Sequence, residues 1–398
     1  MIKVLKFGGT SVGSAANMKK VAEIVRREQA RITVLSAMSG TTDSLVRISR
    51  AAASGDRNAI EEQLAMLTDK YTRCIEELLR ERKQQALARM NATFGLIRDE
   101  AAAFEEYESE RKIIAQGELL TSAIFTAYLQ ETGLKAECLY SPDFMVKDSG
   151  EKVDTERIGR ALARVAGDDS TFFVAQGFIC SDSQGRIDNL GRGGSDYSAA
   201  LMGAAVEAAE VQIWTDIDGM HNNDPRFVDN TRPIRTMSFD EAAELAYFGA
   251  KILHPATIQP CKDHGIAVLL KNTMDPEAPG TTISNRDDDT KSFHAVAAKD
   301  GITVIRIHSA RMLMAYGFLR KVFEIFEQYR TPIDMITTSE VAVSLTVDND
   351  SHIDEIVRDL SALGSIEIER GNSIVCVVGR MAVSYTHLRA HETLRHLV

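Results

Sequence analysis

Three glycines in four positions mark the stretch from Leu190 to Ser198, which reads LGRGGSDYS. An apolar run, Thr171 to Ile179, precedes it, and an Ala-rich run, Ala199 to Ala209, follows it, which is typical of a strand, a Gly-rich loop and a helix. Glycines let a backbone approach a ligand closely. Ser195 is a good N-cap residue, and a helix N-terminus offers free N–H groups to an anion. With the cation Arg192, these residues predict an anion site, although such a loop alone fits a solvent-facing turn equally well.

Further polar and Gly-rich residues follow other predicted strands. Lys6 to Gly9 come at the end of a strand over 2–7, Thr215 and Asp216 follow a strand over 211–214, and Lys251 lies near a later helix end. Sheets of parallel strands bind ligands at the carboxyl ends of their strands. Two lysines, two Gly-rich turns and a helix N-terminus suit a polyphosphate, because phosphoryl transfer needs mostly positioning and cationic stabilisation. The sequence contains no P-loop motif and no dinucleotide-binding fingerprint at its first helix.

The elements that must position these residues form two patterns. Strands and helices alternate over residues 1–285, with a long helical stretch over 43–130, and predict an α/β domain with a mostly parallel sheet between helical layers. Residues 286–300 are polar and predict a linker. Residues 301–372 follow a βαββαβ pattern, which predicts a ferredoxin-like module.

The end of the chain breaks this rhythm. Residues 373–382 predict the start of a second ferredoxin-like module that is cut short, and residues 383–398 match nothing before them. His387 and His391 have a spacing that could bind a metal on a helix. We favour a non-native tail, translated from adapter sequence, and expect no protein metal site.

Composition excludes several classes of function. The net charge of −11 argues against nucleic acid or an anionic membrane as the main partner. The five cysteines include no C-x-x-C pair, which favours reduced thiols over disulfides or a zinc site. The sequence shows no signal peptide and no run of 18 apolar residues, so we expect a cytoplasmic protein.

Four segments together resemble the signature set of the aspartokinases, which have the amino-acid kinase fold. They are residues 6–12 (KFGGTSV), 191–197 (GRGGSDY), 214–216 (WTD) and 248–255 (FGAKILHP). Residues 336–340 (ITTSE) are similar to the effector segment of ACT domains in lysine-sensitive aspartokinases. The resemblance covers residues 1 to about 380 and implies transfer of the ATP γ-phosphoryl group to L-aspartate. The product is 4-phospho-L-aspartate, which opens the biosynthesis of lysine, threonine, methionine and diaminopimelate.

The resemblance also implies roles for individual residues. It assigns catalysis to Lys6, Asp196 and Lys251. It assigns ATP binding to Lys6, Gly8, Gly9, Ser11, Thr215, Asp216, His221, Arg226 and Lys251, with His221 at a position that is commonly Tyr. It assigns aspartate binding to Ser39, Thr42, Glu118, Arg192 and Ser195. The substrate β-carboxylate is already ionised at neutral pH, so no enzyme base is required. ATP would carry Mg²⁺ without a dedicated protein cage.

Regulation by lysine is implied for the second module. The lysine-site pattern matches Met312, Gly317, Phe318, Leu319, Ile333, Asp334, Ser339 and Glu340, whereas Met314 and Ala315 replace a common His and Ser. The resemblance further implies a homodimer in the full-length protein. We expect the shortened chain to show impaired lysine inhibition and weakened dimerisation.

Three alternatives remain open on the sequence. The chain could be another amino-acid kinase, acting on glutamate or carbamate, although the Arg192 and Glu118 pair argues against this. It could be a non-catalytic amino-acid sensor built on the ACT module, against which the intact Lys6, Asp196 and Lys251 argue. It could also be the kinase half of a bifunctional aspartokinase–homoserine dehydrogenase, although the 336–340 segment favours the monofunctional class.

Overall fold

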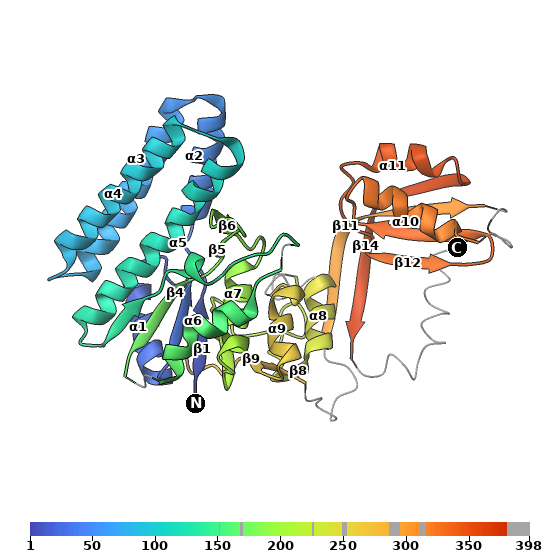
Figure 1. Cartoon of the computed structure of the whole chain (residues 1–398). Helices are drawn as coiled ribbons and strands as arrows, with labels where there is room; N and C mark the ends of the chain where they lie inside the picture. The colour runs from blue at the N-terminus through green and yellow to red at the C-terminus, as the bar shows by residue number, and fades with distance from the viewer. Residues whose placement is uncertain are drawn as a thin grey trace. The chain divides into compact units, whose positions relative to one another are not determined.

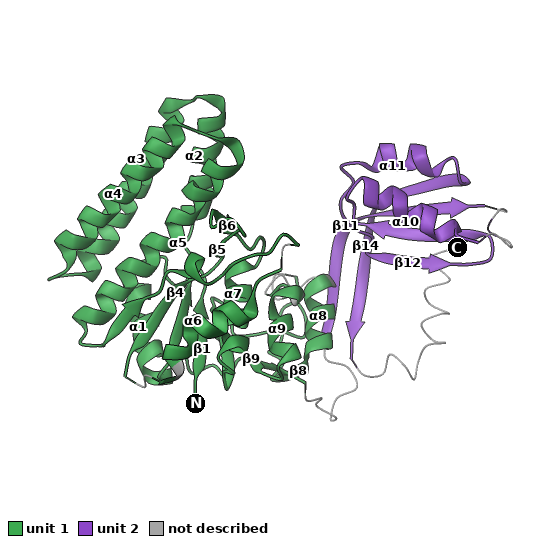
Figure 2. Cartoon of the chain, in the orientation of Figure 1, with its two compact units in different colours: residues 1–292 green, residues 293–398 purple. Residues whose placement is uncertain are grey.

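The computed structural model describes residues 1–150, 152–167, 170–224, 227–248, 253–285, 295–309, 312 and 316–379. They divide into two compact units, residues 1–292 and residues 293–398 (Figure 2). No helix in these ranges is long and apolar enough to cross a membrane.

The first unit is built on an eight-stranded sheet. Its strand order is β3-β4-β2-β1-β7-β9-β10-β8. The strands are β1 (Lys3–Phe7), β2 (Ile32–Leu35), β3 (Ala136–Cys138), β4 (Phe172–Gln176), β7 (Glu210–Thr215), β8 (Thr236–Ser238), β9 (Ala267–Asn272) and β10 (Thr281–Ser284). All neighbours run parallel except β9 and β10, which pair antiparallel. The predicted mostly parallel sheet is confirmed.

Helices surround this sheet (Figure 1). The helices and 3-10 turns of the first unit are α1 (Ala15–Glu28), α2 (Thr41–Ser54), α3 (Arg57–Leu78), α4 (Lys83–Ala102), α5 (Glu106–Glu131), η1 (Ser141–Asp143), α6 (Thr155–Gly167), α7 (Gly194–Ala205), α8 (Phe239–Phe248), η2 (Pro255–Ile258) and α9 (Gln259–Asp263). The predicted helical stretch over 43–130 corresponds to α2 through α5. Together these four helices form an arm that extends beyond the sheet in Figure 1.

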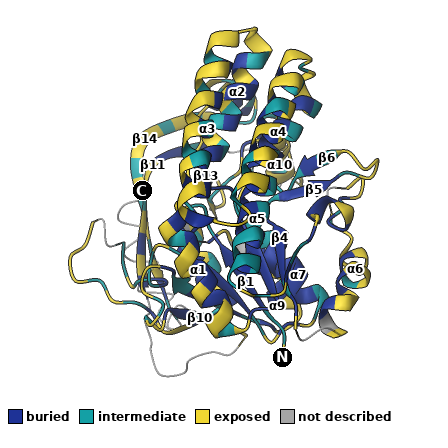
Figure 3. Ribbon diagram, turned by 90° about the vertical axis from the view of Figure 1, so that its left-hand side faces the viewer, coloured by how far each residue is buried: buried dark blue, intermediate teal, exposed yellow. Residues whose placement is uncertain are grey.

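Burial explains why the central strands are almost continuously apolar. Four residues of β1, Val4 to Phe7, and all of β2 are buried, as expected for parallel strands that are covered on both faces (Figure 3). Leu5 and Phe7 belong to the core that contains the buried residues of α1 and α5. Because side chains alternate along a strand, Lys6 points to the opposite face, where it meets α7.

The second unit has a four-stranded antiparallel sheet with the order β12-β13-β11-β14. Its elements are β11 (Ala295–His308), α10 (Phe318–Gln328), β12 (Met335–Thr338), β13 (Ala342–Val347), α11 (Ile353–Leu360) and β14 (Ser365–Val378). This is the predicted βαββαβ module, and its core joins the two helices to β11 and β13.

Two predicted boundaries of the second unit are wrong. Residues 295–300 were expected in a linker, but they form the first part of β11. Residues 373–378 were expected to start another module, but they continue β14 and pair with residues 295–299 of β11. The long ladder joins both segments to the same sheet, with a register shift near Ile302. The remaining linker residues, 286–294, and the tail, 380–398, lie outside the described residues.

Candidate active site

A buried ion pair joins the first strand to the Gly-rich segment. Lys6, near the end of β1, places its Nζ atom 2.8 Å from Oδ1 of Asp196, in the first turn of α7. Each residue is only 8% exposed. The negative end of this pair lies at a helix N-terminus, where the macrodipole favours an anion. Two of the three residues that the resemblance assigned to catalysis, although distant in the sequence, are therefore in direct contact.

The Gly-rich segment starts differently from its prediction. The strand before it, β4, ends at Gln176, and the hairpin of β5 (Ile179–Ser181) and β6 (Ile187–Asn189) lies between β4 and the loop. Helix α7 begins at Gly194, with Gly193 as its N-cap in the left-handed conformation. The prediction that Ser195 caps the helix is wrong, because this serine already lies inside the first turn. Its hydroxyl instead accepts a hydrogen bond from Ser36 Oγ at 3.0 Å.

The loop and the ion pair share one cavity of about 360 Å³. The cavity contains two further groups with opposite charge, the exposed Arg192 and the buried Glu118. Its lining residues are Lys6, Ser36, Thr42, Glu118, Phe178, Gly191, Arg192, Gly193, Gly194, Ser195 and Asp196. Its charged groups could pair with the carboxylates and the ammonium group of a small amino acid.

Glu118 lies in α5 and is 3% exposed. One carboxylate oxygen accepts a hydrogen bond from the backbone N–H of Ala37 at 3.2 Å, and Oε2 has no hydrogen-bond partner among the described residues. Burial, only partly offset by backbone hydrogen bonds, raises the pKa of Glu118 to about 7. A cationic group placed in the cavity would therefore gain a strong partner.

The two predicted aspartate-binding residues after β2 occupy different positions. Thr42, in the first turn of α2, lines the cavity. Ser36, which was not predicted, also lines it. Ser39 is exposed and is not among the lining residues; its carbonyl oxygen accepts a hydrogen bond from Lys70. Thr42 therefore belongs to the cavity, whereas Ser39 belongs to the loop that supports it.

A buried ion triad lies at the root of the Gly-rich loop. Asp188, in β6, is 5% exposed and contacts Lys147 Nζ at 2.7 Å and Arg111 of α5. Burial opposes ionisation of this carboxyl group, but the hydrogen bonds from Lys147 and Arg111 outweigh burial and lower its pKa. The Asp188 carboxylate also accepts a hydrogen bond from the backbone N–H of Asn189. The side-chain oxygen of Asn189 in turn accepts a hydrogen bond from the backbone N–H of Gly191 at 3.1 Å. The triad thus fixes the backbone from which Arg192 extends.

The loops after β1 and β7 meet beside this cavity. The backbone N–H of Gly8 donates to the carbonyl of Trp214 at 3.3 Å, immediately before Thr215. Ser11 is fully buried, and its hydroxyl donates to the carbonyl of Trp214 at 3.5 Å and lies 2.7 Å from that of Thr273 after β9, so it joins the loop after β1 to the ends of β7 and β9. Gly9 lies in the same turn. The structure therefore brings together four of the predicted ATP-binding residues: Gly8, Gly9, Ser11 and Thr215. The Ser11 hydroxyl, however, already has a hydrogen-bond partner in the protein.

The rest of the predicted nucleotide site is only partly described. Asp216 is exposed. Both ring nitrogens of His221 have protein partners, Thr231 at 2.8 Å and Asp218 at 2.6 Å, which leaves the face of the ring for any nucleotide contact. Arg226 and Lys251 lie outside the described residues.

The predicted lysine-site residues lie in the second unit, around the start of α10 and β12. Met312, Phe318 and Ile333 pack against its core, while Gly317, Leu319, Ser339 and Glu340 are exposed. Asp334 is within 3.4 Å of Lys299, which also pairs with Asp348 at 2.7 Å. Met314 and Ala315 lie outside the described residues.

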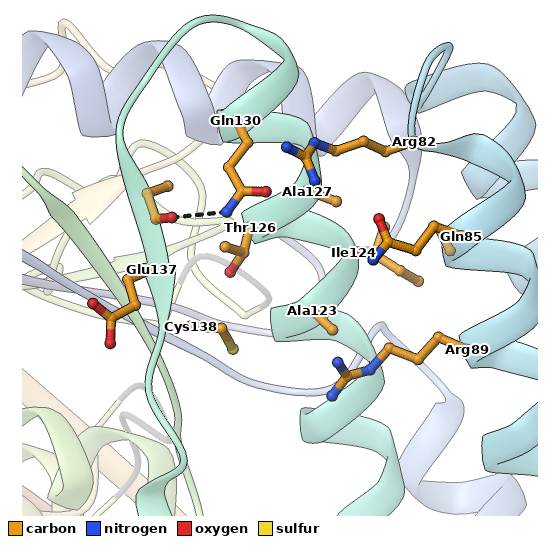
Figure 4. A pocket seen from close by; sticks show the side chains of 12 residues that line it. Arg82, Gln85, Arg89, Ala123, Ile124, Thr126, Ala127, Gln130, Glu137 and Cys138 are labelled. Atoms are coloured by element: carbon orange, nitrogen blue, oxygen red, sulfur yellow. Dashed lines mark hydrogen bonds between the residues drawn. The ribbon is translucent and has the colours of Figure 1, made fainter.

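A second cavity of the first unit, of about 260 Å³, contains none of the predicted site residues that the structure describes. Arg82, which precedes α4, and Gln85 and Arg89 of α4 face small residues of α5, among them Ala123 and Ala127 (Figure 4). All three of these long side chains are exposed. This groove lies apart from the ion pair and the Gly-rich loop.

The described residues contain no group of three or more His, Cys, Asp or Glu side chains that could hold a metal ion. Asp196, a carboxylate in the candidate cavity, is already paired with Lys6. This donor set fits Mg²⁺ only if the phosphates and water provide most of its ligands.

Sequence reasoning missed several residues of the site. Ser36 follows β2 directly, so its position at a strand end could have identified it. Phe178 also lines the cavity, with a positive φ of 67° that residue type does not predict. The Asp188 triad joins three distant segments and gave no local signal.

Comparison with known proteins agrees with this geometry. Residues 1–272 match the model of the amino acid kinase family. The chain is 34% identical over 405 residues to the lysine-sensitive aspartokinase 3 of Escherichia coli, covering 95% of this chain and 87% of that protein. It is also 34% identical over 409 residues to the chloroplastic aspartokinase 1 of Arabidopsis thaliana, covering 95% and 70%.

Solved structures give the same result. The E. coli aspartokinase III in complex with aspartate and ADP (R-state) matches with a TM-score of 0.83 and 32% identity, over 96% of this chain and 89% of that one. The same enzyme in complex with lysine and aspartate (T-state) matches with a TM-score of 0.80 and 33% identity, over 95% and 87%. This chain belongs to the aspartokinases of the amino acid kinase family.

Proposed function

We propose that the cavity around the Lys6–Asp196 pair is the site where this aspartate kinase phosphorylates L-aspartate. The observation that carries this assignment is the buried pair itself, which shares one cavity with Arg192 and Glu118. The Arg192 guanidinium would hold the α-carboxylate of aspartate through two parallel hydrogen bonds. Glu118 would pair with the α-ammonium, which leaves the β-carboxylate to face Lys6.

The reaction then needs little covalent chemistry from the protein. An oxygen of the β-carboxylate attacks the γ-phosphorus of ATP, the bond from phosphorus to the bridging β–γ oxygen breaks, and ADP leaves with that electron pair. The attacking group is ionised at neutral pH, so no proton must be removed. Lys6 offers a cation to the charge on the transferring phosphoryl group, and Asp196 holds the Lys6 ammonium in place.

ATP is proposed to bind beside the loops after β1 and β7. Gly8 and Gly9 let the backbone approach the phosphates, and Thr215 and Asp216 lie toward the nucleoside. Mg²⁺ would enter on the phosphates and neutralise part of their charge. The contacts of Arg226 and Lys251 with the nucleotide, and that of His221, are part of the same proposal.

The second unit is proposed to bind L-lysine as a feedback effector. Support comes from the similarity of residues 336–340 to effector segments, and from a structure of the E. coli relative in complex with lysine and aspartate. A homodimer of the full-length protein and a cytoplasmic location complete the proposal. A bifunctional relationship is less well supported, because the chain is 29% identical to an A. thaliana bifunctional relative but 34% identical to E. coli aspartokinase 3.

The test is an acceptor panel with ATP and Mg²⁺, in which hydroxylamine traps any acyl phosphate formed. We expect the trapped product with L-aspartate and not with L-glutamate or carbamate. Lys6→Met should abolish it, whereas Lys3→Met, on the same strand but paired with Glu28 and Glu210, should not. Equal turnover in wild type and Lys6→Met would refute the assignment, and turnover of glutamate alone would indicate a different amino-acid kinase.

A further inference from the structure

The segment from Ser36 to Thr42, here termed the acceptor loop, is held by side chains as well as by its own backbone. On α5, Glu118 accepts a hydrogen bond from the backbone N–H of Ala37, and Thr121 Oγ1 accepts from that of Met38, both at 3.2 Å. Two consecutive amides of the loop therefore depend on one helix for their partners. Losing such a partner leaves a buried polar group unsatisfied, which is costly.

A second layer of contacts comes from α3, which contributes nothing to the cavity lining. The Tyr71 hydroxyl is 3.2 Å from Thr41 Oγ1 and 3.3 Å from Thr121 Oγ1, so it bridges the loop to α5. Tyr71 is fully buried. Its neighbour Lys70 donates to the carbonyl of Ser39 and lies 3.4 Å from Thr41 Oγ1.

We propose that Tyr71 and Lys70 of α3 are positioning residues for the acceptor, because they fix the acceptor loop and thereby Thr42 in the cavity. This inference rests on the proposed function of that cavity as the aspartate site. It gives the helical arm, which the sheet does not need for its own pairing, a part in building the acceptor site.

Packing around the acceptor loop leaves it little room to move and form new contacts if those of Tyr71 or Lys70 are lost. A Cβ atom at Gly117, one residue before Glu118, would lie 2.8 Å from Cβ of Ala37, so α5 and the loop are already in closest contact. Burial raises the pKa of Tyr71 to about 12, so its hydroxyl stays protonated between the hydroxyls of Thr41 and Thr121. Misplacing a binding group by about 1 Å can reduce turnover about 100-fold, so a bridge at this point matters for function.

The nucleotide side provides the contrast that makes the proposal testable. The loops after β1 and β7 meet through Gly8 and Trp214, and among their described residues none has a side-chain hydrogen bond to Tyr71 or Lys70. The acceptor loop touches the loop after β1 through the backbone N–H of Ser39, which donates to the carbonyl of Gly9 at 3.0 Å. Because this bond joins backbone atoms that neither side chain supplies, loss of the Tyr71 or Lys70 contacts should weaken aspartate binding more than ATP binding.

The experiment compares Tyr71→Phe and Lys70→Met with wild type in steady-state kinetics and in calorimetric titration of L-aspartate. Tyr71→Phe keeps the ring that packs on Phe94 and removes only the hydroxyl. The matched control is Ser49→Ala, which removes a buried hydroxyl of α2 that bonds only to Leu45 in its own helix. Lys70→Arg tests whether a donor at that position rescues binding.

We expect Tyr71→Phe to raise the KM and Kd for aspartate about fivefold, the value of one ordinary hydrogen bond. The KM for ATP should stay within about twofold, Ser49→Ala should resemble wild type, and Lys70→Arg should bind aspartate better than Lys70→Met. Unchanged aspartate binding in Tyr71→Phe and Lys70→Met, or equal rises in both KM values, would overturn the inference. Absence of aspartate phosphorylation in wild type would instead overturn the proposed function, so the two failures can be told apart.

Discussion

Replacing Glu118 by glutamine should change how the stability of this protein depends on pH. Burial raises the pKa of the wild-type carboxyl group to about 7 in the folded chain, from an ordinary value of 4.5. Between these two values the folded state binds a proton that the unfolded state has released, so stability falls as pH rises. The interval corresponds to about 3 kcal/mol, which is fully present below pH 4.5 and lost as pH rises through 7.

Urea unfolding of the ligand-free protein at pH 5 and pH 8 measures this pH-dependent contribution of Glu118 to the unfolding free energy. Glutamine keeps an oxygen for the Ala37 N–H and does not titrate, so Glu118→Gln should lack this part of the pH dependence. The control is Glu62→Gln, a change at an exposed position of α3. If wild type and Glu118→Gln lose the same stability between the two pH values, burial of Glu118 does not have the energetic effect argued above.

The remaining predictions concern the ion pair, the loop and its root. Lys6→Met should reduce kcat at least about 100-fold, because the transferring phosphoryl group loses a cation. It should also lower the unfolding free energy by about 3 kcal/mol, because the Asp196 carboxylate stays buried without its partner. Adding Asp196→Asn should restore the stability in urea but not kcat. Gly177→Ala should raise the KM for aspartate severalfold and lower the Tm, since a Cβ there would lie 2.6 Å from that of Ser195. Asp188→Asn should lower the unfolding free energy by about 3 kcal/mol in urea titration, because two cations then share a buried site without their carboxylate.

The sequence was informative where chemistry follows directly from strand order. Lys6 lies near the end of a buried strand and the Gly-rich loop precedes a helix, and the carboxyl edge of a parallel sheet brings such segments together. The contact between Lys6 and Asp196 could therefore be predicted from the sequence pattern. Glu118 was not, because a glutamate within a long helix gives no local sign of burial, and only the resemblance to a family identified it.

The errors have equally definite physical causes. Ser195 is a residue type that favours N-caps, but Gly193 is the N-cap, in the left-handed conformation, so the helix starts two residues earlier than a cap at Ser195 would place it. The hairpin of β5 and β6 was missed because three-residue strands are too short for a periodic signal. Residues 295–300 appeared to be part of a polar linker, although pairing with β14 over the long ladder stabilises them as a strand.

Helix α5 gives the acceptor site a fixed length. Arg111, which holds the root of the Gly-rich loop, and Glu118, which holds the acceptor loop, are seven residues apart on this one helix, or about 10.5 Å along its axis. The Gly-rich loop and the acceptor loop are thus both held by side chains of the same helix. With aspartate bound as proposed, this spacing would favour acceptors with one methylene group between the α-carbon and the second carboxylate, and a longer acceptor would require a change along the helix as well as in the loops.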